Sequence, residues 1–225
     1  TSMATADAWA VRSHQRARDA WAAGRFDAEV VPVSVPQKKG AALVFANDEG
    51  VRGDASCEGL AALRPLMKDG TVTAGNSSQQ NDAAAACLVV AEEKLAELRL
   101  APMGFLVDWA AAGCEPATMG YGPVPAVARI FRRTGLSFDQ MDLVEVNEAF
   151  ACQVLAVLEG WGWNDPDRIN VNGSGISLGH PIGATGVRIL ATLLHELERR
   201  GGRYGLETLC VGGGQGLAAI FERAT

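Results

Sequence analysis

Apolar and polar positions in the first hundred residues predict one long helix followed by short strands and loops. Residues 5–23 mix small or apolar positions with charged ones as a surface helix does, and Gly24 is a typical C-terminal stop. Residues 29–36 alternate like a strand, and residues 42–45 form a short apolar strand between charged turns. Residues 87–91 read as a buried strand that leads into a helix.

In the second half of the chain, predicted strands alternate with predicted helices. Residues 103–113 and 142–146 are apolar strands, and the latter leads through a sharp polar junction into a helix. Residues 124–134 are apolar on one side and carry three arginines on the other, as an amphipathic helix does. Residues 184–200 form a further helix, and residues 205–222 read as strand, glycine turn and strand. On the helix over 184–200 we expect one apolar face, made of Val187, Leu190, Leu194 and Leu197.

This alternation of strands and helices predicts a layered α/β fold. Because the last two strands form a hairpin, the sheet should be mixed rather than purely parallel. The length of 225 residues, with 48% hydrophobic residues, is enough for one large domain with a real core.

Charge and cysteine usage narrow the class of protein. A net charge of −6 and a pI near 5.1 give no reason to expect nucleic acid or an anionic membrane as partner. No apolar run approaches the roughly 20 residues of a membrane span, and the N-terminus lacks the layout of a secretory signal. The five cysteines show no CxxC spacing, so we expect reduced thiols in a cytoplasmic protein, with no disulfide framework and no metal site. Cys87 and Cys152 read as small buried apolar residues.

Three strand ends each carry one reactive side chain: Asn147, His180 and Cys210. Strand ends surrounded by glycine are where α/β proteins usually place their sites. Each residue also has a simpler interpretation, because Asn147 could cap a helix, His180 could only pack, and Cys210 could be a small buried residue. The combination of all three is what favours a site.

The surroundings of His180 and Cys210 suit proton transfer. His180 lies between Gly179 and Pro181, and we expect a helix to begin near Ile182 or Gly183 with its positive end close to the ring. That environment disfavours imidazolium and keeps the ring available as a base or a hydrogen-bond donor. Glycines follow Cys210 almost at once, and their N–H groups could converge on a substrate oxygen beside the thiol.

The motifs around these residues resemble those of a known family. They are NEAF (147–150), NGSGISLGHPIGATG (172–186) and CVGGGQG (210–216). Together with residues 17–26, 63–82 and 119–126, they resemble the thiolases, the acyl-CoA acyltransferases, and look closest to bacterial acetyl-CoA acetyltransferases and β-ketothiolases. The resemblance implies the layered αβαβα thiolase fold and reversible thiolytic cleavage of a 3-ketoacyl-CoA or Claisen condensation of two acyl-CoA molecules.

The resemblance also implies roles for single residues. His180 would activate the nucleophilic cysteine and hold a thioester oxygen, and Asn147 would position a water in the same oxyanion hole. Cys210 would be the acid/base for the α-proton, and the N–H of Gly212 would line a second oxyanion hole. Preorganised donors of this kind stabilise an enolate as it forms. Coenzyme A and acyl-CoA would be substrates, with no permanently bound cofactor.

Coenzyme A contacts carry over in the same way. Ser78, Ala74 and Gly75 fall on the loop that touches the pantetheine arm in the family, and Arg52 falls near the adenine and phosphates. The apolar walls of the pantetheine tunnel would include Met67, Met119 and Phe150, although both methionines could equally fill the core. Gln79 and Gln80 stand where the family often has glycine before an apolar residue, which leaves the shape of this loop open.

The nucleophilic cysteine of the family has no counterpart here. It lies in a glycine-rich setting that surrounds neither Cys57 nor Cys114. We therefore expect the C-terminal portion of a thiolase, missing roughly 100–200 residues. The expected division is residues 1–80 as the rest of the loop domain with the CoA-binding loop, 81–102 as a strand and helix of the N-terminal half, and 103–225 as the C-terminal domain.

Two other functions remain open at this point. A non-catalytic acyl-CoA-binding relative would tend to lose one of the three side chains, and all three are present. A ketoacyl synthase relative would share the fold but usually carries a different histidine pattern. As partners we expect acyl-CoA, CoA, the missing N-terminal segment, and further copies in a homodimer or tetramer.

Overall fold

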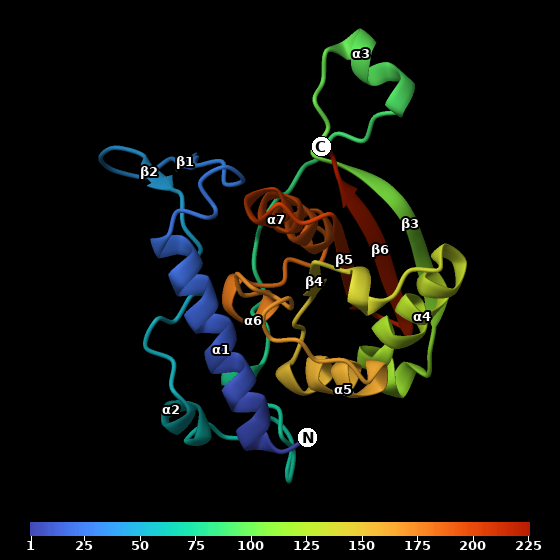
Figure 1. The fold of residues 1–225 in the computed structure, drawn as a ribbon. Coiled ribbons are helices and arrows are strands. Elements are labelled where there is room, and N and C mark those ends of the chain that lie inside the picture. The colour runs from blue at the N-terminus through green and yellow to red at the C-terminus, as the bar shows by residue number, and fades with distance from the viewer.

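The computed structural model describes all residues from 1 to 225 and is built around a four-stranded mixed sheet with strand order β3-β6-β5-β4 (Figure 1). The strands are β3 (Gly104–Gly113), β4 (Leu143–Val146), β5 (Tyr204–Val211) and β6 (Gln215–Arg223). β4 runs parallel to β5, whereas β6 is antiparallel to both β5 and β3. The predicted mixed sheet and the terminal hairpin are therefore confirmed.

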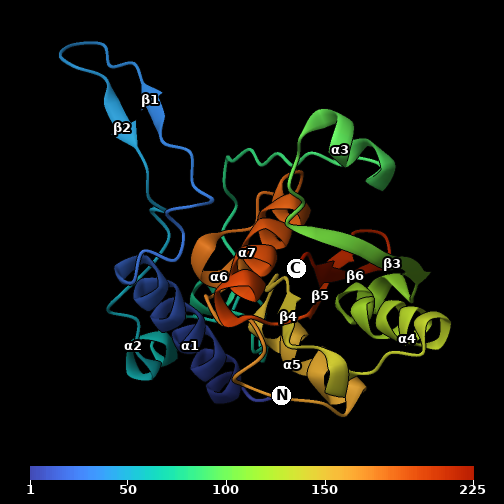
Figure 2. The ribbon, with the colours of Figure 1, turned by 45° about the horizontal axis from the view of Figure 1, so that its top comes forward.

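Helices cover both faces of this sheet (Figure 2). On one face α4 (Pro123–Thr134) and α5 (Ala151–Trp161) pack on the strands through Val127, Ile130 and Val154. On the other face α7 (Thr185–Arg200) places Leu193 and Leu197 against Leu143 of β4. The arginines of α4 are exposed, and Gly135 ends the helix with a φ of 72°, as its pattern predicts.

The helix predicted over residues 184–200 is present as α7, but the apolar face expected for it is wrong. The buried row is Ile189, Leu193 and Leu197, so only Leu197 belongs to the face expected from the sequence. The helix begins at Thr185 rather than near Ile182 or Gly183, because the chain first forms a turn in which the carbonyl oxygen of Pro181 accepts the N–H groups of Ala184 and Thr185. The buried face differs because α7 carries apolar residues on more than one side, and tertiary packing selects the side that is buried.

The first half of the chain contributes one long helix to the body. α1 (Met3–Ala22) is capped by Ser2 and packs Ala6, Trp9 and Ala10 into the main core. It runs beside α6 (Gly175–Leu178) and α2 (Cys57–Ala61) (Figure 1). The remaining short 3-10 helices are η1 (Ala74–Asn76), η2 (Glu92–Lys94), η3 (Pro116–Tyr121) and η4 (Phe138–Gln140).

β1 (Val33–Val35) and β2 (Leu43–Phe45) form a separate antiparallel hairpin that extends away from the body (Figure 2). The strand predicted over residues 29–36 is shorter than expected because Pro32 and Pro36 flank it, and proline has no N–H to donate. Every residue of both strands is exposed.

The buried strand predicted over residues 87–91 is absent. This segment is extended without a partner, and Leu88 and Val89 are 83% and 90% exposed. A strand needs the N–H and C=O groups of a neighbour, and no other segment of the chain provides them here. Cys87 is consequently exposed, so its assignment as a buried residue is wrong, and Cys152 is half-buried. The helix predicted next is present as η2 and α3 (Leu95–Leu98), which project from the body (Figure 1).

None of the helices is both long enough and apolar enough to cross a lipid bilayer.

Candidate active site

Asn147 and Cys210 lie at the same edge of the sheet. Asn147 follows the last residue of β4, and its N–H donates to the carbonyl oxygen of Thr208 in β5 at 3.0 Å. Cys210 lies two residues further along β5, near the end of that strand. Because β4 and β5 are parallel, their carboxyl ends meet at this edge, as the sequence suggested.

The carboxamide of Asn147 contacts the segment that leads to His180. A Cβ added to Gly175 would lie 2.8 Å from Oδ1 of Asn147, so glycine is required for this close approach. Asn147 is fully buried, and neither Oδ1 nor Nδ2 has a hydrogen-bond partner in the protein. Buried amides are normally bonded, so this amide is available to a small polar molecule.

Glu148 holds this arrangement together, although no sequence pattern pointed to this residue as functional. Its buried carboxylate accepts hydrogen bonds from Trp9 Nε1 at 2.9 Å and Ser13 Oγ at 2.6 Å, both on α1. It also accepts from Asn170 Nδ2 at 3.1 Å and from the N–H of Ile176 at 3.4 Å. The Glu148 side chain therefore connects α1, the loop before α6 and α6 itself to the segment that carries Asn147.

The backbone of His180 is fixed by the loop over residues 79–81. Its N–H lies 3.1 Å from the carbonyl oxygen of Gln79 and 3.2 Å from Oδ1 of Asn81. Gly179 has a φ of 95°, in the left-handed region that favours glycine, and a Cβ there would lie 2.2 Å from Oδ1 of Asn81. Gln79 itself donates to the carbonyl of Gly50 at 2.9 Å, which connects this loop to the first half of the chain.

The imidazole of His180 is half-buried, and its Nδ1 lies 2.7 Å from Oγ1 of Thr185. Burial lowers the pKa of His180 below its ordinary value, and the positive charge of Arg188 lowers it further. The ring therefore favours its neutral form, as we expect from the sequence. The main physical causes are burial and Arg188, whereas the sequence pointed to the start of a helix.

Cys210 is 6% exposed and pairs with Gly216 across the β5–β6 hairpin. Burial raises the pKa of its thiol, with a smaller contribution from Cys114 nearby. Cys210 is thus in its protonated thiol form at neutral pH.

In the turn after Cys210, part of the backbone is exposed to solvent and is not covered by side chains. Gly212 is exposed, and a Cβ there would meet nothing within 4 Å. Gly214 adopts a φ of 91°, and its carbonyl oxygen accepts the N–H of Cys114 at 2.8 Å. The turn is anchored on one side by this contact and open at Gly212 on the other.

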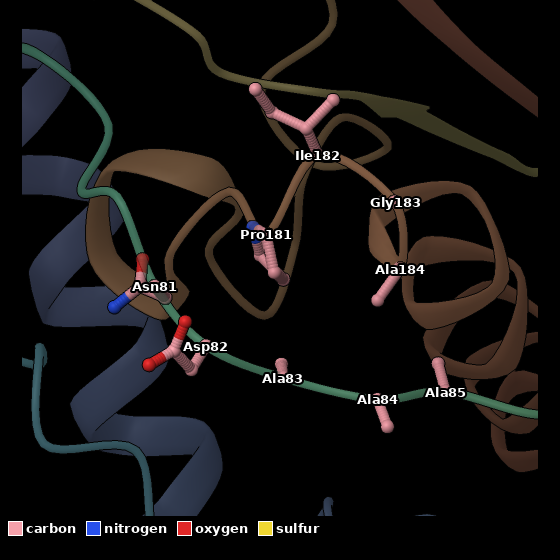
Figure 3. A pocket seen from close by; sticks show the side chains of 9 residues that line it. All are labelled: Asn81, Asp82, Ala83, Ala84, Ala85, Pro181, Ile182, Gly183 and Ala184. Carbon is pink, nitrogen blue, oxygen red and sulfur yellow. The ribbon is translucent and has the colours of Figure 1, made fainter.

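An open pocket of about 460 Å³ is lined by Pro181, the residue that follows His180 in the chain (Figure 3). Residues 81–85 form one side, and Pro181, Ile182, Gly183 and Ala184 form the other. Figure 3 shows the extended segment after Asn81 running past the loop that precedes α7. Ile182 is 80% exposed, so this side of the site has an apolar rim.

A second open cavity, of about 420 Å³, collects some of the residues expected to contact CoA. Arg52, Ala74 and Gly75 line it, together with His14 and Leu60. The N–H of Arg52 donates to Nδ1 of His14 at 3.1 Å. The structure thus brings three of the seven expected CoA contacts to one cavity.

The other four expected contacts lie outside this cavity. Ser78 donates its N–H to the carbonyl of Ala149 at 2.9 Å, and the adjacent Ser77 pairs with Phe150, so this loop packs on the NEAF segment. Phe150 is 40% exposed, and Met67 is 76% exposed and so does not belong to the core formed within this chain. Met119 accepts a hydrogen bond from the Cys114 thiol through its carbonyl, at 3.8 Å.

A layer of buried charge lies between the sheet and α7. All three guanidinium nitrogens of Arg188 are buried without a hydrogen bond, close to Glu145, Glu29 and Asp48. Burial raises the pKa of Glu145 well above its ordinary value and that of Glu29 to about 7. Burial likewise raises the pKa of Glu207 to about 8, and Arg188 lowers it in part. No cluster of three or more metal-ligating side chains is present.

Two sequence families match this chain. One, described as the thiolase N-terminal domain, matches residues 1–93, and the other, the thiolase C-terminal domain, matches residues 100–223. The chain therefore belongs to the thiolase family, as its motifs indicated.

Similar proteins bear more specific names. The chain is 52% identical over 218 residues to an acetyl-CoA acetyltransferase of Chromobacterium violaceum, which covers 96% of this chain and 55% of that protein. It is 46% identical to a 3-ketoacyl-CoA thiolase of Aliivibrio fischeri, over 96% of this chain and 57% of that protein. The chain thus spans about half the length of the curated relatives it matches.

Solved structures confirm the expected thiolase-like α/β fold. The crystal structure of the Bacillus anthracis acetyl-CoA acetyltransferase matches all of this chain and 57% of its own, with a TM-score of 0.96 and 44% identity. The human mitochondrial 3-ketoacyl-CoA thiolase in complex with CoA matches all of this chain and 56% of its own, with a TM-score of 0.91 and 41% identity.

Proposed function

We propose that this chain is the C-terminal portion of an acyl-CoA C-acyltransferase that cleaves 3-ketoacyl-CoA with CoA, or condenses two acyl-CoA molecules. The observation that carries this proposal is the meeting of three segments at one sheet edge. Asn147 is bonded to β5, the strand of Cys210, and its amide contacts Gly175 in the segment that leads to His180.

The steps of the reaction are divided among these residues. A cysteine from the N-terminal portion accepts the acyl group, and His180 takes the proton of that cysteine. Cys210 removes or returns the α-proton of the second acyl-CoA, and the raised pKa of its thiol means that the free site holds Cys210 in the protonated form at neutral pH. His180 and a water held by the free amide of Asn147 bind the thioester oxygen, and the N–H of Gly212 binds the oxygen of the acyl-enzyme.

CoA lies along the loop of Ala74, Gly75 and Ser78. Arg52 lines the same cavity as Ala74 and Gly75 and supplies a planar cation for the adenine and phosphates. Phe150 is exposed beside Ser77 and offers an apolar wall. We also assign Met67 and Met119 to the pantetheine tunnel, on the resemblance alone.

The division of the chain follows from the same proposal. Residues 1–80 complete the loop domain, residues 81–102 belong to the N-terminal half, and residues 103–225 form the C-terminal domain. The exposed Leu88 and Val89 support this division, because they need an apolar partner that the chain itself does not provide. The partner is the nucleophile-bearing N-terminal segment, in a cytoplasmic homodimer or tetramer.

A chimera tests the proposal. The matching part of the Chromobacterium violaceum relative is replaced by this chain, and cleavage of acetoacetyl-CoA is followed in the presence of CoA. We expect turnover, and we expect His180→Ala or Cys210→Ser to lower it by about 10²–10⁴-fold. His195→Ala is the matched control, because His195 lies on α7 outside the residues of the three motifs, and this substitution should leave turnover unchanged.

Exchange of the α-protons distinguishes the binding-only alternative. The chimera is incubated with acetyl-CoA in D₂O, and loss of the methyl proton signal is measured. The proposal expects exchange that Cys210→Ser abolishes and Cys152→Ser leaves intact. A folded chimera that binds CoA but shows neither cleavage nor exchange would mean that the chain only binds acyl-CoA.

A further inference from the structure

Thr185 is the only side chain that the structure bonds to the ring of His180. Its Oγ1 lies 2.7 Å from Nδ1 of the ring, and Thr185 itself is fully buried. The same Oγ1 lies 2.9 Å from the carbonyl oxygen of Pro181, four residues earlier, to which it donates. No sequence pattern predicted this contact between Thr185 and His180.

Counting protons limits the bonds of the Thr185 hydroxyl to two arrangements. A threonine hydroxyl has one hydrogen to donate and two lone pairs to accept with. If that hydrogen goes to Pro181, the ring must be the donor in the second bond, so Nδ1 carries the proton. That carbonyl also accepts the N–H groups of Ala184 and Thr185, at 2.8 and 2.9 Å. The opposite arrangement, with the hydroxyl turned to Nδ1, places the ring proton on Nε2 and is the alternative that the test must exclude.

We propose that Thr185 is a positioning residue for His180: its hydroxyl accepts the Nδ1–H of the ring and so keeps Nε2 free to take a proton. The role of Nε2 as a base rests on the function proposed above, but the position of the ring proton does not. Because Gln79 and Asn81 already fix the backbone of His180, the bond to Thr185 fixes the remaining freedom of the ring.

A second histidine provides an internal contrast. Nδ1 of His14 accepts the N–H of Arg52, and a backbone N–H can only donate. Neutral His14 must therefore carry its proton on Nε2, the opposite of what we expect for His180. The chain has only three histidines, so every ring can be assigned.

Nitrogen NMR of the 225-residue chain reads the tautomers directly. The chain is labelled with ¹⁵N-histidine and examined at about pH 8, well above the ordinary histidine pKa of about 6.5. Rings are assigned with His180→Gln and His195→Gln. We expect a protonated Nδ1 and a bare Nε2 in His180, and the reverse in His14. A bare Nδ1 in His180 overturns the proposal whatever the enzymatic activity.

Two variants test whether the hydroxyl is the cause. Thr185→Val keeps the shape but removes the hydroxyl, and the His180 ring should become a mixture of tautomers while His14 is unchanged. Thr185→Ser restores the acceptor and should restore the Nδ1–H form. An unchanged His180 tautomer in Thr185→Val would also overturn the proposal. If Thr185→Val does not fold, the wild-type and Thr185→Ser spectra still decide it.

In the chimera described above, Thr185→Val should lower turnover by about 10–100-fold at unchanged CoA affinity, and Thr185→Ser should recover most of it. A chimera without any activity counts against the proposed function. An inactive chimera does not affect the NMR result on the His180 tautomer, so failure of the proposed function can be distinguished from failure of the role proposed for Thr185.

Discussion

Glu207 makes the stability of the chain depend on pH. It lies on β5 directly opposite Glu145 of β4, is 6% exposed, and faces the buried Arg188. Two buried carboxylates on adjacent strands share that cation, with Glu29 also close to it. Burial consequently raises the pKa of Glu207 from 4.5 to about 8.

A raised pKa means that the folded chain holds a proton that the unfolded chain releases. The stability from this group is therefore fully present below about pH 4.5 and is lost as the pH rises through about 8. Within this window the loss is about 1.4 kcal/mol per pH unit, which amounts to about 4 kcal/mol between pH 5 and 8. Glu207→Gln removes the titration while keeping the shape and a neutral polar group.

The expected result is a stability difference that grows with pH. Glu207→Gln should match the parent chain near pH 5 and exceed it by about 3–4 kcal/mol near pH 8. Urea unfolding followed by circular dichroism at about one-unit steps measures this. The control is Glu198→Gln, because Glu198 is exposed on α7. Parallel pH curves for the parent and Glu207→Gln would refute the reasoning, since Glu207 would then be ionised in the folded chain.

The remaining predictions concern backbone packing and thiol reactivity. Gly216→Ala should prevent the hairpin from packing, because its Cβ would lie 2.0 Å from the backbone of Gly122, and loss of the cooperative melting transition measures this. A Gly216→Ala chain that melts like the parent contradicts it. With an aromatic disulfide reagent at neutral pH, the exposed Cys57 and Cys87 should react at once and Cys210 slowly, because it is buried and its pKa is raised. If Cys210→Ser removes one of the fast-reacting thiols, this assignment is wrong.

Local sequence patterns predicted most of the elements and the family. The amphipathic stretch of α4 with its Gly135 stop, the strand before Asn147 and the glycine hairpin after Cys210 all form where the sequence indicates. These features depend on residues within a few positions of one another, so the hydrophobic period and the turn residues can be identified from the sequence alone. The three motifs likewise lie within short segments, which is why they could be recognised before any contact was known.

Contacts between distant segments decided the rest. Glu148 is held by hydrogen bonds from Trp9 and Ser13, which lie more than 130 residues earlier in the sequence. A local sequence pattern cannot predict such a bond. The buried face of α7 depends on which of its apolar rows meets the sheet, and the state of Glu207 depends on a strand and a helix that enclose it. Residues 87–91 have a strand-like sequence but no strand, because hydrogen bonding in a sheet requires a neighbour as well as a propensity.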